Sequence, residues 1–79
     1  MTTTLNDIPV GESATIRSFT SALPQLRRKL LSLGVMPGAE VTVKRVAPLG
    51  DPIQIQLRGT SISLRRQEAA ILVVTPQSI

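Results

Sequence analysis

The sequence predicts a mainly β domain, a small barrel of five short strands with one short helix inserted after the first strand. Apolar residues alternate with polar ones in several short segments, which is the pattern of half-buried strands. Only residues 23–33 instead space their leucines for a helix. The chain has 79 residues and no internal linker, so we expect a single domain over residues 1–79. An open five-stranded sheet of that size would expose apolar edges, and closure into a barrel removes them.

The expected strands are bounded by turns rich in glycine and proline. The first strand has Ala14 and Ile16 on one face, and the IQIQL stretch at 53–57 is the clearest half-buried strand. Gly59 reverses the chain, so 53–64 is expected to form a hairpin. The last apolar run does not alternate, which indicates burial on both faces. The expected strands cover residues 14–19, 40–44, 53–57, 60–64 and 71–74, with a short turn or single helical turn at 65–70.

A leucine stripe predicts the helix. Its members recur at spacings of three, four and three residues, which places them on one helical face: Leu23, Leu26, Leu30 and Leu33. Gly34 follows the last of them and suits the position after a helix C-terminus. We therefore expect the four leucines to pack in the core. The opposite face is basic and carries Arg27, Arg28 and Lys29.

The composition argues against catalysis. Histidine and cysteine are absent, which removes the commonest general base and the commonest nucleophile pairing. The carboxylates are scattered and are interpreted as caps and solvent-facing charges: Asp7, Glu12, Glu40, Asp51 and Glu68. Metal sites need clustered cysteine, histidine or oxygen ligands, and no phosphate-binding loop motif occurs. We predict a protein that is not an enzyme and that binds no metal or cofactor.

The charge balance leaves several kinds of partner open. The formal net charge is +4 and the pI is near 11.3, which suits an acidic protein, an anionic membrane face or nucleic acid. Phe19 is the only aromatic residue, so the chain lacks the usual platform for stacking bases. We interpret the basic residues as solvated outer faces, with nucleic-acid binding through phosphate contacts kept as the alternative.

Two turns carry apolar residues where polar ones are usual. The first is GVMPG at 34–38, and the second is APLGDP at 47–52. An apolar side chain held by proline and glycine loses little entropy when it binds, so each turn suits either a docking contact or a lid over the core. We expect the two turns to bind a protein partner together with the basic helix face. The predicted contact residues are Val35, Met36, Pro37, Leu49, Gly50, Pro52, Arg27, Arg28 and Lys29.

Residues 27–74 resemble the ferrous iron transport protein A family, FeoA. The similar stretches are LLSLGVMPGAEVTV, APLGDPIQIQLRG and SISLRRQEAAILV, in that order, and the opening LNDIPVGESATIRSF is similar as well. The resemblance implies an SH3-like barrel with a helical insertion. It also implies a cytoplasmic accessory of the ferrous iron transporter FeoB, acting at its GTP-binding part. The same barrel type forms the C-terminal domain of iron-dependent repressors, which gives a second context.

The termini and the composition agree with a cytoplasmic protein. The start MTTTLNDIPVGE lacks the basic and apolar regions of a signal peptide, and the run AAILVV is too short to span a bilayer. A chain without cysteine suits a reducing compartment. We expect it in the cytoplasm, recruited to the inner face of the membrane by its partner, with self-association left open.

Overall fold

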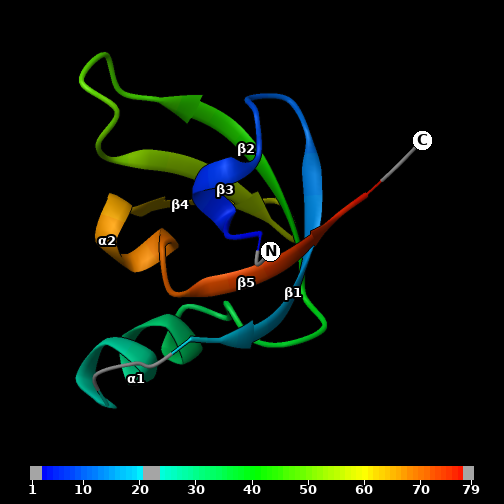
Figure 1. Cartoon of the computed structure of the whole chain (residues 1–79), viewed down its shortest axis with the longest axis vertical. Coiled ribbons are helices and arrows are strands. Elements are labelled where there is room, and N and C mark those ends of the chain that lie inside the picture. The colour runs from blue at the N-terminus through cyan, green and yellow to red at the C-terminus, as the bar shows by residue number, and fades with distance from the viewer. Residues whose placement is uncertain (1–2, 21–23, 78–79) are drawn as a thin grey trace.

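The computed structural model describes residues 3–20 and 24–77. These residues form a curled antiparallel sheet flanked by short helices (Figure 1). The strands are β1 (Ser13–Phe19), β2 (Glu40–Val46), β3 (Ile53–Leu57), β4 (Thr60–Leu64) and β5 (Leu72–Pro76). The helical segments are the 3-10 turn η1 (Leu5–Asp7), the helix α1 (Pro24–Ser32) and the single turn α2 (Arg66–Ala69). The predicted mainly β fold with one short helix after the first strand is confirmed.

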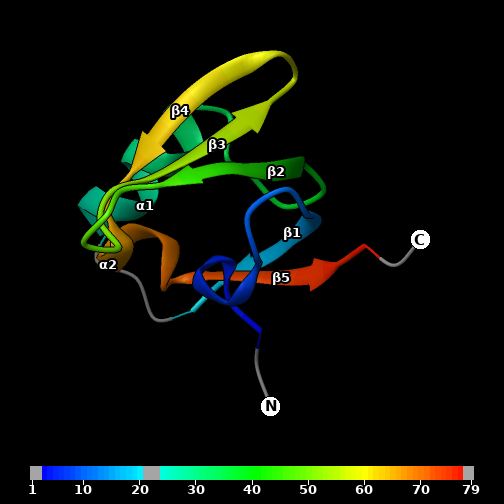
Figure 2. The same ribbon diagram turned by 90° about the horizontal axis from the view of Figure 1, so that it is seen from above.

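The sheet has the strand order β4-β3-β2-β1-β5 and wraps around the core (Figure 2). Its pairing shifts register between Ile16 and Ser18 in β1 and between Val43 and Arg45 in β2. Such irregularities bend a strand and increase its twist, which lets a short sheet curl. In the part of the chain that is described, β4 and β5 do not pair with each other. The barrel is therefore partly open rather than fully closed by hydrogen bonds as expected, and α2 connects its two end strands.

The core comes from the inward residues of all five strands. Their alternation in the sequence matches their alternation in burial, as in the pattern of β3, where every second residue is buried. η1 adds Leu5 and Ile8 follows it, so the N-terminal turn also covers the core. The buried strand residues are Ala14, Ile16, Val41, Val43, Ile53, Ile55, Leu57, Ile62, Leu64, Leu72 and Val74.

The leucine stripe of α1 packs less deeply than its spacing predicts. Leu30 is fully buried, whereas Leu26 is half-buried and Leu33 is 39% exposed. Leu23 lies outside the described residues. The expectation of a fully buried stripe is wrong for Leu33, which follows the last residue of α1 and precedes the turn at Gly34.

Gly34 ends α1 in a Schellman motif. Its φ is +89°, its N–H donates to the Leu31 carbonyl at 3.0 Å, and the Val35 N–H donates to the Leu30 carbonyl at 3.0 Å. This motif directs the apolar residue after the glycine back against the helix, and Val35 is accordingly buried beside the core. The chain then turns at Pro37-Gly38 as predicted, with a hydrogen bond from the Ala39 N–H to the Met36 carbonyl at 3.0 Å.

Candidate functional site

The two apolar turns lie at opposite ends of β2. Turn 34–38 leads into β2, and loop 47–52 follows it, on the other side of the molecule in both views (Figures 1 and 2). β2 has seven residues, which corresponds to about 20 Å of extended chain. The sequence predicts that the two turns form one contact surface. The structure instead places them apart.

Turn 34–38 offers little apolar surface. Val35 is 0% exposed because of the Schellman motif, so the expectation that it lies at the tip of a turn is wrong. Met36 is 41% exposed and Pro37 is exposed. Of the three contact residues predicted in this turn, only Met36 and Pro37 present side chains to solvent.

Loop 47–52 projects an apolar side chain. Leu49 is 94% exposed, the highest value among the large apolar residues that the structure describes. The loop holds it with backbone hydrogen bonds at its base, where the Gly50 N–H donates to the Ala47 carbonyl at 2.7 Å and the Ala47 N–H donates to the Pro52 carbonyl at 3.0 Å. An apolar group presented by a hydrogen-bonded loop is suited to docking because little order remains to be imposed on binding.

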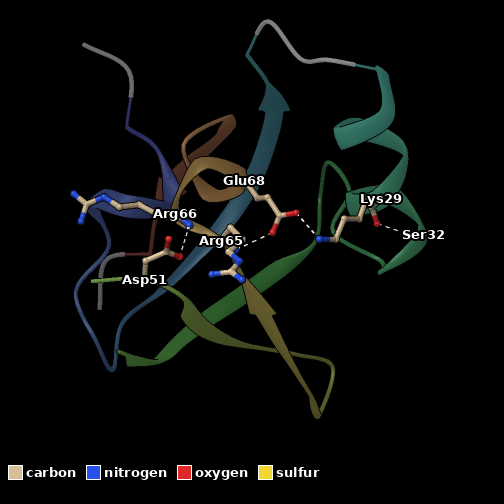
Figure 3. Close-up of polar contacts among 6 residues, drawn as sticks. All are labelled: Lys29, Ser32, Asp51, Arg65, Arg66 and Glu68. Atoms are coloured by element: carbon tan, nitrogen blue, oxygen red, sulfur yellow. Dashed lines mark hydrogen bonds and ion pairs between the residues drawn. The ribbon is translucent and has the colours of Figure 1, made fainter. Parts of the chain in front are cut away.

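The loop is fastened to α2 (Figure 3). The backbone N–H of Arg66 donates to Oδ1 of Asp51 at 3.0 Å. Gly50 has a φ of +85°, and a Cβ placed on it would lie 3.0 Å from the guanidinium of Arg66. Glycine therefore satisfies both the backbone conformation and the close approach of Arg66 to the loop.

Beside this contact lies an open hollow of about 620 Å³. It is lined by η1, loop 47–52 and α2, and Asn6 of η1 donates from Nδ2 to the Arg66 carbonyl at 3.0 Å. Two arginines and one carboxylate line it, so its charge is net positive. We name this region the loop–α2 surface and define it as Asn6, Leu49, Gly50, Asp51, Arg65, Arg66 and Gln67.

α1 is joined to the same region by an ion pair. Nζ of Lys29 lies 2.6 Å from Oε2 of Glu68, whose side chain is nearly fully buried, and the backbone N–H of Arg65 donates to Oε1 at 2.8 Å (Figure 3). Burial raises the pKa of the Glu68 carboxyl, but the hydrogen bonds from Lys29 and Arg65 and their positive charges hold that pKa below its ordinary value. Glu68 is thus an internal link: its interpretation as a cap is confirmed, since it accepts the Arg65 N–H at the start of α2, but it does not face solvent.

The basic face of α1 is divided among different contacts. Lys29 binds Glu68, and the guanidinium of Arg27 lies 5.4 Å from the ring centroid of Phe19. Arg28 is exposed. The three residues that the sequence analysis assigned together to a partner therefore have separate surroundings, and Lys29 contributes to the fold.

The residues that complete the loop–α2 surface are not among the contact residues predicted from the sequence. Arg65 and Arg66 belong to the basic residues that the sequence indicates as solvated, and no pattern in the sequence marks Asn6 or Gln67. One local signal was available for α2, because Glu68 follows Arg65 at the spacing of a capping box. The contact between Asp51 and Arg66 has no comparable local pattern.

The surface combines an exposed aliphatic side chain with two arginines and one carboxylate. Within residues 3–20 and 24–77, no group of three or more potential metal ligands occurs. In the same residues, no helix is both long and apolar enough to cross a membrane. Loop, hollow and barrel together define a small SH3-like domain that presents an apolar tip beside positive charge.

The family model for the FeoA domain matches residues 3–76, and the chain belongs to this family. FeoA domains are small non-catalytic accessory domains associated with ferrous iron transport. FeoA of Chlorobium tepidum is 37% identical with a TM-score of 0.88, over 96% of this chain and 71% of that one. FeoA of Stenotrophomonas maltophilia, described as a prokaryotic SH3 domain protein, is 32% identical with a TM-score of 0.78, over 91% of this chain and 88% of that one.

A curated relative joins two functions in one polypeptide. It is the Fe(2+) transport protein A/Fe(2+) transporter FeoB fusion protein of Porphyromonas gingivalis, 31% identical over 89% of this chain. This chain spans 8% of its length. A manganese-dependent transcriptional repressor is also similar, with a TM-score of 0.88 at 19% identity, and that likeness shows the fold alone.

Proposed function

We propose that this protein is a cytoplasmic adaptor of ferrous iron uptake that docks on the cytoplasmic GTP-binding domain of a FeoB-type transporter. The observation that carries the proposal is the relative in which a FeoA part and FeoB are one polypeptide. Joining two proteins in one chain raises their effective concentration to the millimolar range for short connections, which favours partners that act together. A FeoA part that acts on the transporter has to recognise it through its own surface.

The loop–α2 surface is the docking contact that the geometry favours. Leu49 supplies an aliphatic anchor with almost all its surface available. Arg66 reaches the neighbouring Gly50, and Arg65 and Arg66 line the adjoining hollow with positive charge. Interfaces of this kind gain affinity from an apolar contact that becomes desolvated, while surrounding charges raise the association rate and orient the partner.

The proposal is tested with the purified cytoplasmic domain of the cognate FeoB-type transporter. Calorimetric titration should show binding to the wild-type chain and a loss of at least about tenfold in affinity for Leu49→Asp, because a charge replaces the apolar anchor. Met36→Asp, at the other end of β2, is the matched control and should bind like the wild type. Equal binding by both variants would remove loop 47–52 from the contact, and absence of wild-type binding would contradict the function.

The alternative function is nucleic-acid binding, and a second titration tests it. A parallel titration with duplex DNA and with RNA at two salt concentrations distinguishes the classes, because phosphate contacts weaken steeply as salt rises. Tight, salt-sensitive association with either polymer, together with none to the transporter domain, would replace the adaptor function with nucleic-acid binding.

A further inference from the structure

The two end strands of the sheet differ in how their outer sides are covered. Along β5, the Val74 N–H donates to the Thr3 carbonyl at 2.9 Å, and Thr4 forms a bridge with Val73. Along β4, no further strand is present in the described part of the chain. An uncovered edge presents free N–H and C=O groups, which pair readily with another extended segment.

The hairpin register identifies the free groups on β4. Arg58 and Gly59 have φ values of +52° and +81°, as in the two-residue turn that matches strand twist. Leu57 pairs with Thr60 directly across this turn. Hydrogen-bonded and non-hydrogen-bonded pairs alternate along an antiparallel ladder, starting from that closing pair.

By this alternation, Thr60, Ile62 and Leu64 bond to β3. Ser61 and Ser63 then direct their N–H and C=O groups away from it, and both residues are exposed. Among the turn, loop and cap hydrogen bonds of residues 3–20 and 24–77, none ends on either serine. Two donors and two acceptors are therefore available on the outer side of β4.

β4 lacks the devices that usually protect an edge. Its sequence TSISL has no charge and no proline, and its pairing with β3 has no register shift. Natural edge strands are commonly blunted by one of these features. The five residues of β4 thus form a regular template for an added strand.

The charges at the two ends of β4 determine which kind of segment can pair with this edge. Arg58 precedes β4, and Arg65 and Arg66 follow it, the latter two at the net positive hollow. A second copy paired antiparallel about Ile62 would place Arg58 opposite Arg66 of the other copy, and such like-charge pairs are destabilising. An extended segment with acidic ends instead meets opposite charges at both ends.

We propose that the outer edge of β4 binds an extended, acid-flanked segment of another protein as an added strand. The backbone of that segment pairs with Ser61 and Ser63, and its terminal carboxylates lie beside Arg58 and Arg65. This mode of recognition takes its affinity from main-chain hydrogen bonds and its selectivity from the flanking charges. The inference goes beyond the proposed function, and it holds whichever protein supplies the segment.

The test uses the full chain and a synthetic peptide of eight residues. Six alternating threonines and valines lie between two terminal glutamates, with both peptide ends blocked, and a control peptide has lysines in place of the glutamates. NMR titration should shift the amide signals of Ser61 and Ser63 and slow their hydrogen exchange. The lysine peptide should bind about fivefold or more weakly, because two attractive charge pairs become repulsive. Equal binding of both peptides, or shifts located elsewhere, would overturn the proposal.

Two variants sharpen the result. Ser63→Pro removes an outward N–H without removing a bond to β3, and should abolish peptide binding while the hairpin stays folded. Arg58→Asp places a residue type that tolerates positive φ in the turn and should abolish the preference between the peptides, because each peptide then meets one opposite and one like charge; this keeps the test valid if the proline variant misfolds. Lys44→Glu, on β2, is the matched charge control and should change nothing. Concentration-dependent self-association through the same amides would identify a second copy as the occupant and refute the acidic segment.

Discussion

Turn 34–38 and loop 47–52 have similar residues, but the apolar residue Val35 is buried in the first and Leu49 is exposed in the second. Both combine glycine and proline with a large apolar residue, and both adjoin β2. In the first, two hydrogen bonds to α1 draw Val35 into the core. In the second, the bonds to Arg66 and within the loop hold its base, so Leu49 stays outside. Composition selects a rigid turn, and the partner of the turn's backbone decides whether its apolar residue stabilises the fold or remains free to bind.

The largest expected effect on stability comes from replacing the apolar residue of each turn, Val35 or Leu49, with aspartate. Val35→Asp places a carboxylate in the core and should reduce the free energy of unfolding by about 4 kcal/mol, enough to unfold much of a small domain. Leu49→Asp should change it by less than about 0.5 kcal/mol, because the site is in water. Urea denaturation followed by circular dichroism measures both. A similar midpoint for the two variants would erase the distinction between the turns.

A smaller effect should follow from cutting the link between the two regions. α1 ends at turn 34–38, α2 contacts loop 47–52, and the Lys29–Glu68 pair joins the helices. Glu68→Gln should lower the free energy of unfolding by about 1–2 kcal/mol, because the amide has one acceptor oxygen, so one of the two charge-assisted hydrogen bonds is lost and the other weakens. Glu12→Gln, at an exposed carboxylate, is the control.

The stability that Glu68 contributes should depend on pH. The pKa of Glu68 is lower in the folded chain than its ordinary value near 4.5, so the folded state binds fewer protons on this group than the unfolded state. The stabilisation is therefore complete above that ordinary value and is lost as pH falls through the folded pKa. The difference in free energy of unfolding between wild type and Glu68→Gln should shrink in denaturation curves as pH falls below 4.5. A difference that grows in acid would contradict the assigned charge state.

The glycines of the two regions should separate stability from binding. Gly34→Ala and Gly50→Ala each place a side chain at positive φ and should cost about 1 kcal/mol in thermal or urea unfolding. Gly50→Ala should also weaken binding of the transporter domain, since its Cβ would displace the Arg66 guanidinium. Gly11→Ala has positive φ and no heavy atom near the added Cβ, so it isolates the backbone cost. Unchanged binding by Gly50→Ala would show that the position of Arg66 is unimportant.

The smallest expected effect concerns Met36. Met36→Ser removes a partly exposed thioether from turn 34–38 and should change the free energy of unfolding by less than about 0.5 kcal/mol. It should leave calorimetric binding of the transporter domain at the wild-type level. A loss of binding here would move the docking surface to the other end of β2.

Local patterns in the sequence are sufficient to predict the strands. Alternation identified the buried residues of β3 directly, and glycine identified the hairpin turn and the end of α1. These features depend on a few neighbouring residues, whose propensities and burial agree. The resemblance to FeoA, carried by three stretches in order, is confirmed by the family match over residues 3–76.

The arrangement of the surface could not be read from local patterns. Lys29 and Glu68 lie on separate helices, and Asp51 meets Arg66 only after β3 and β4 have formed their hairpin. Such contacts depend on how the sheet curls, which sequence spacing does not specify. Sequence spacing likewise does not show that β2 holds the two turns apart, so their closeness in sequence led to the wrong expectation that they act together. Whether the predicted contact residues bind a partner stays a prediction.

The direction in which the described chain leaves the barrel has a practical consequence. The C-terminal end of β5 lies on the side of the molecule away from α2 and loop 47–52 (Figure 1), and Gln77 follows it in the chain. The molecule measures 31 × 27 × 26 Å. A domain attached behind Gln77 would therefore need a tether of at least about ten extended residues to reach around to the exposed leucine. Short C-terminal affinity tags or surface attachments should leave that face accessible, which makes this end the natural point of immobilisation.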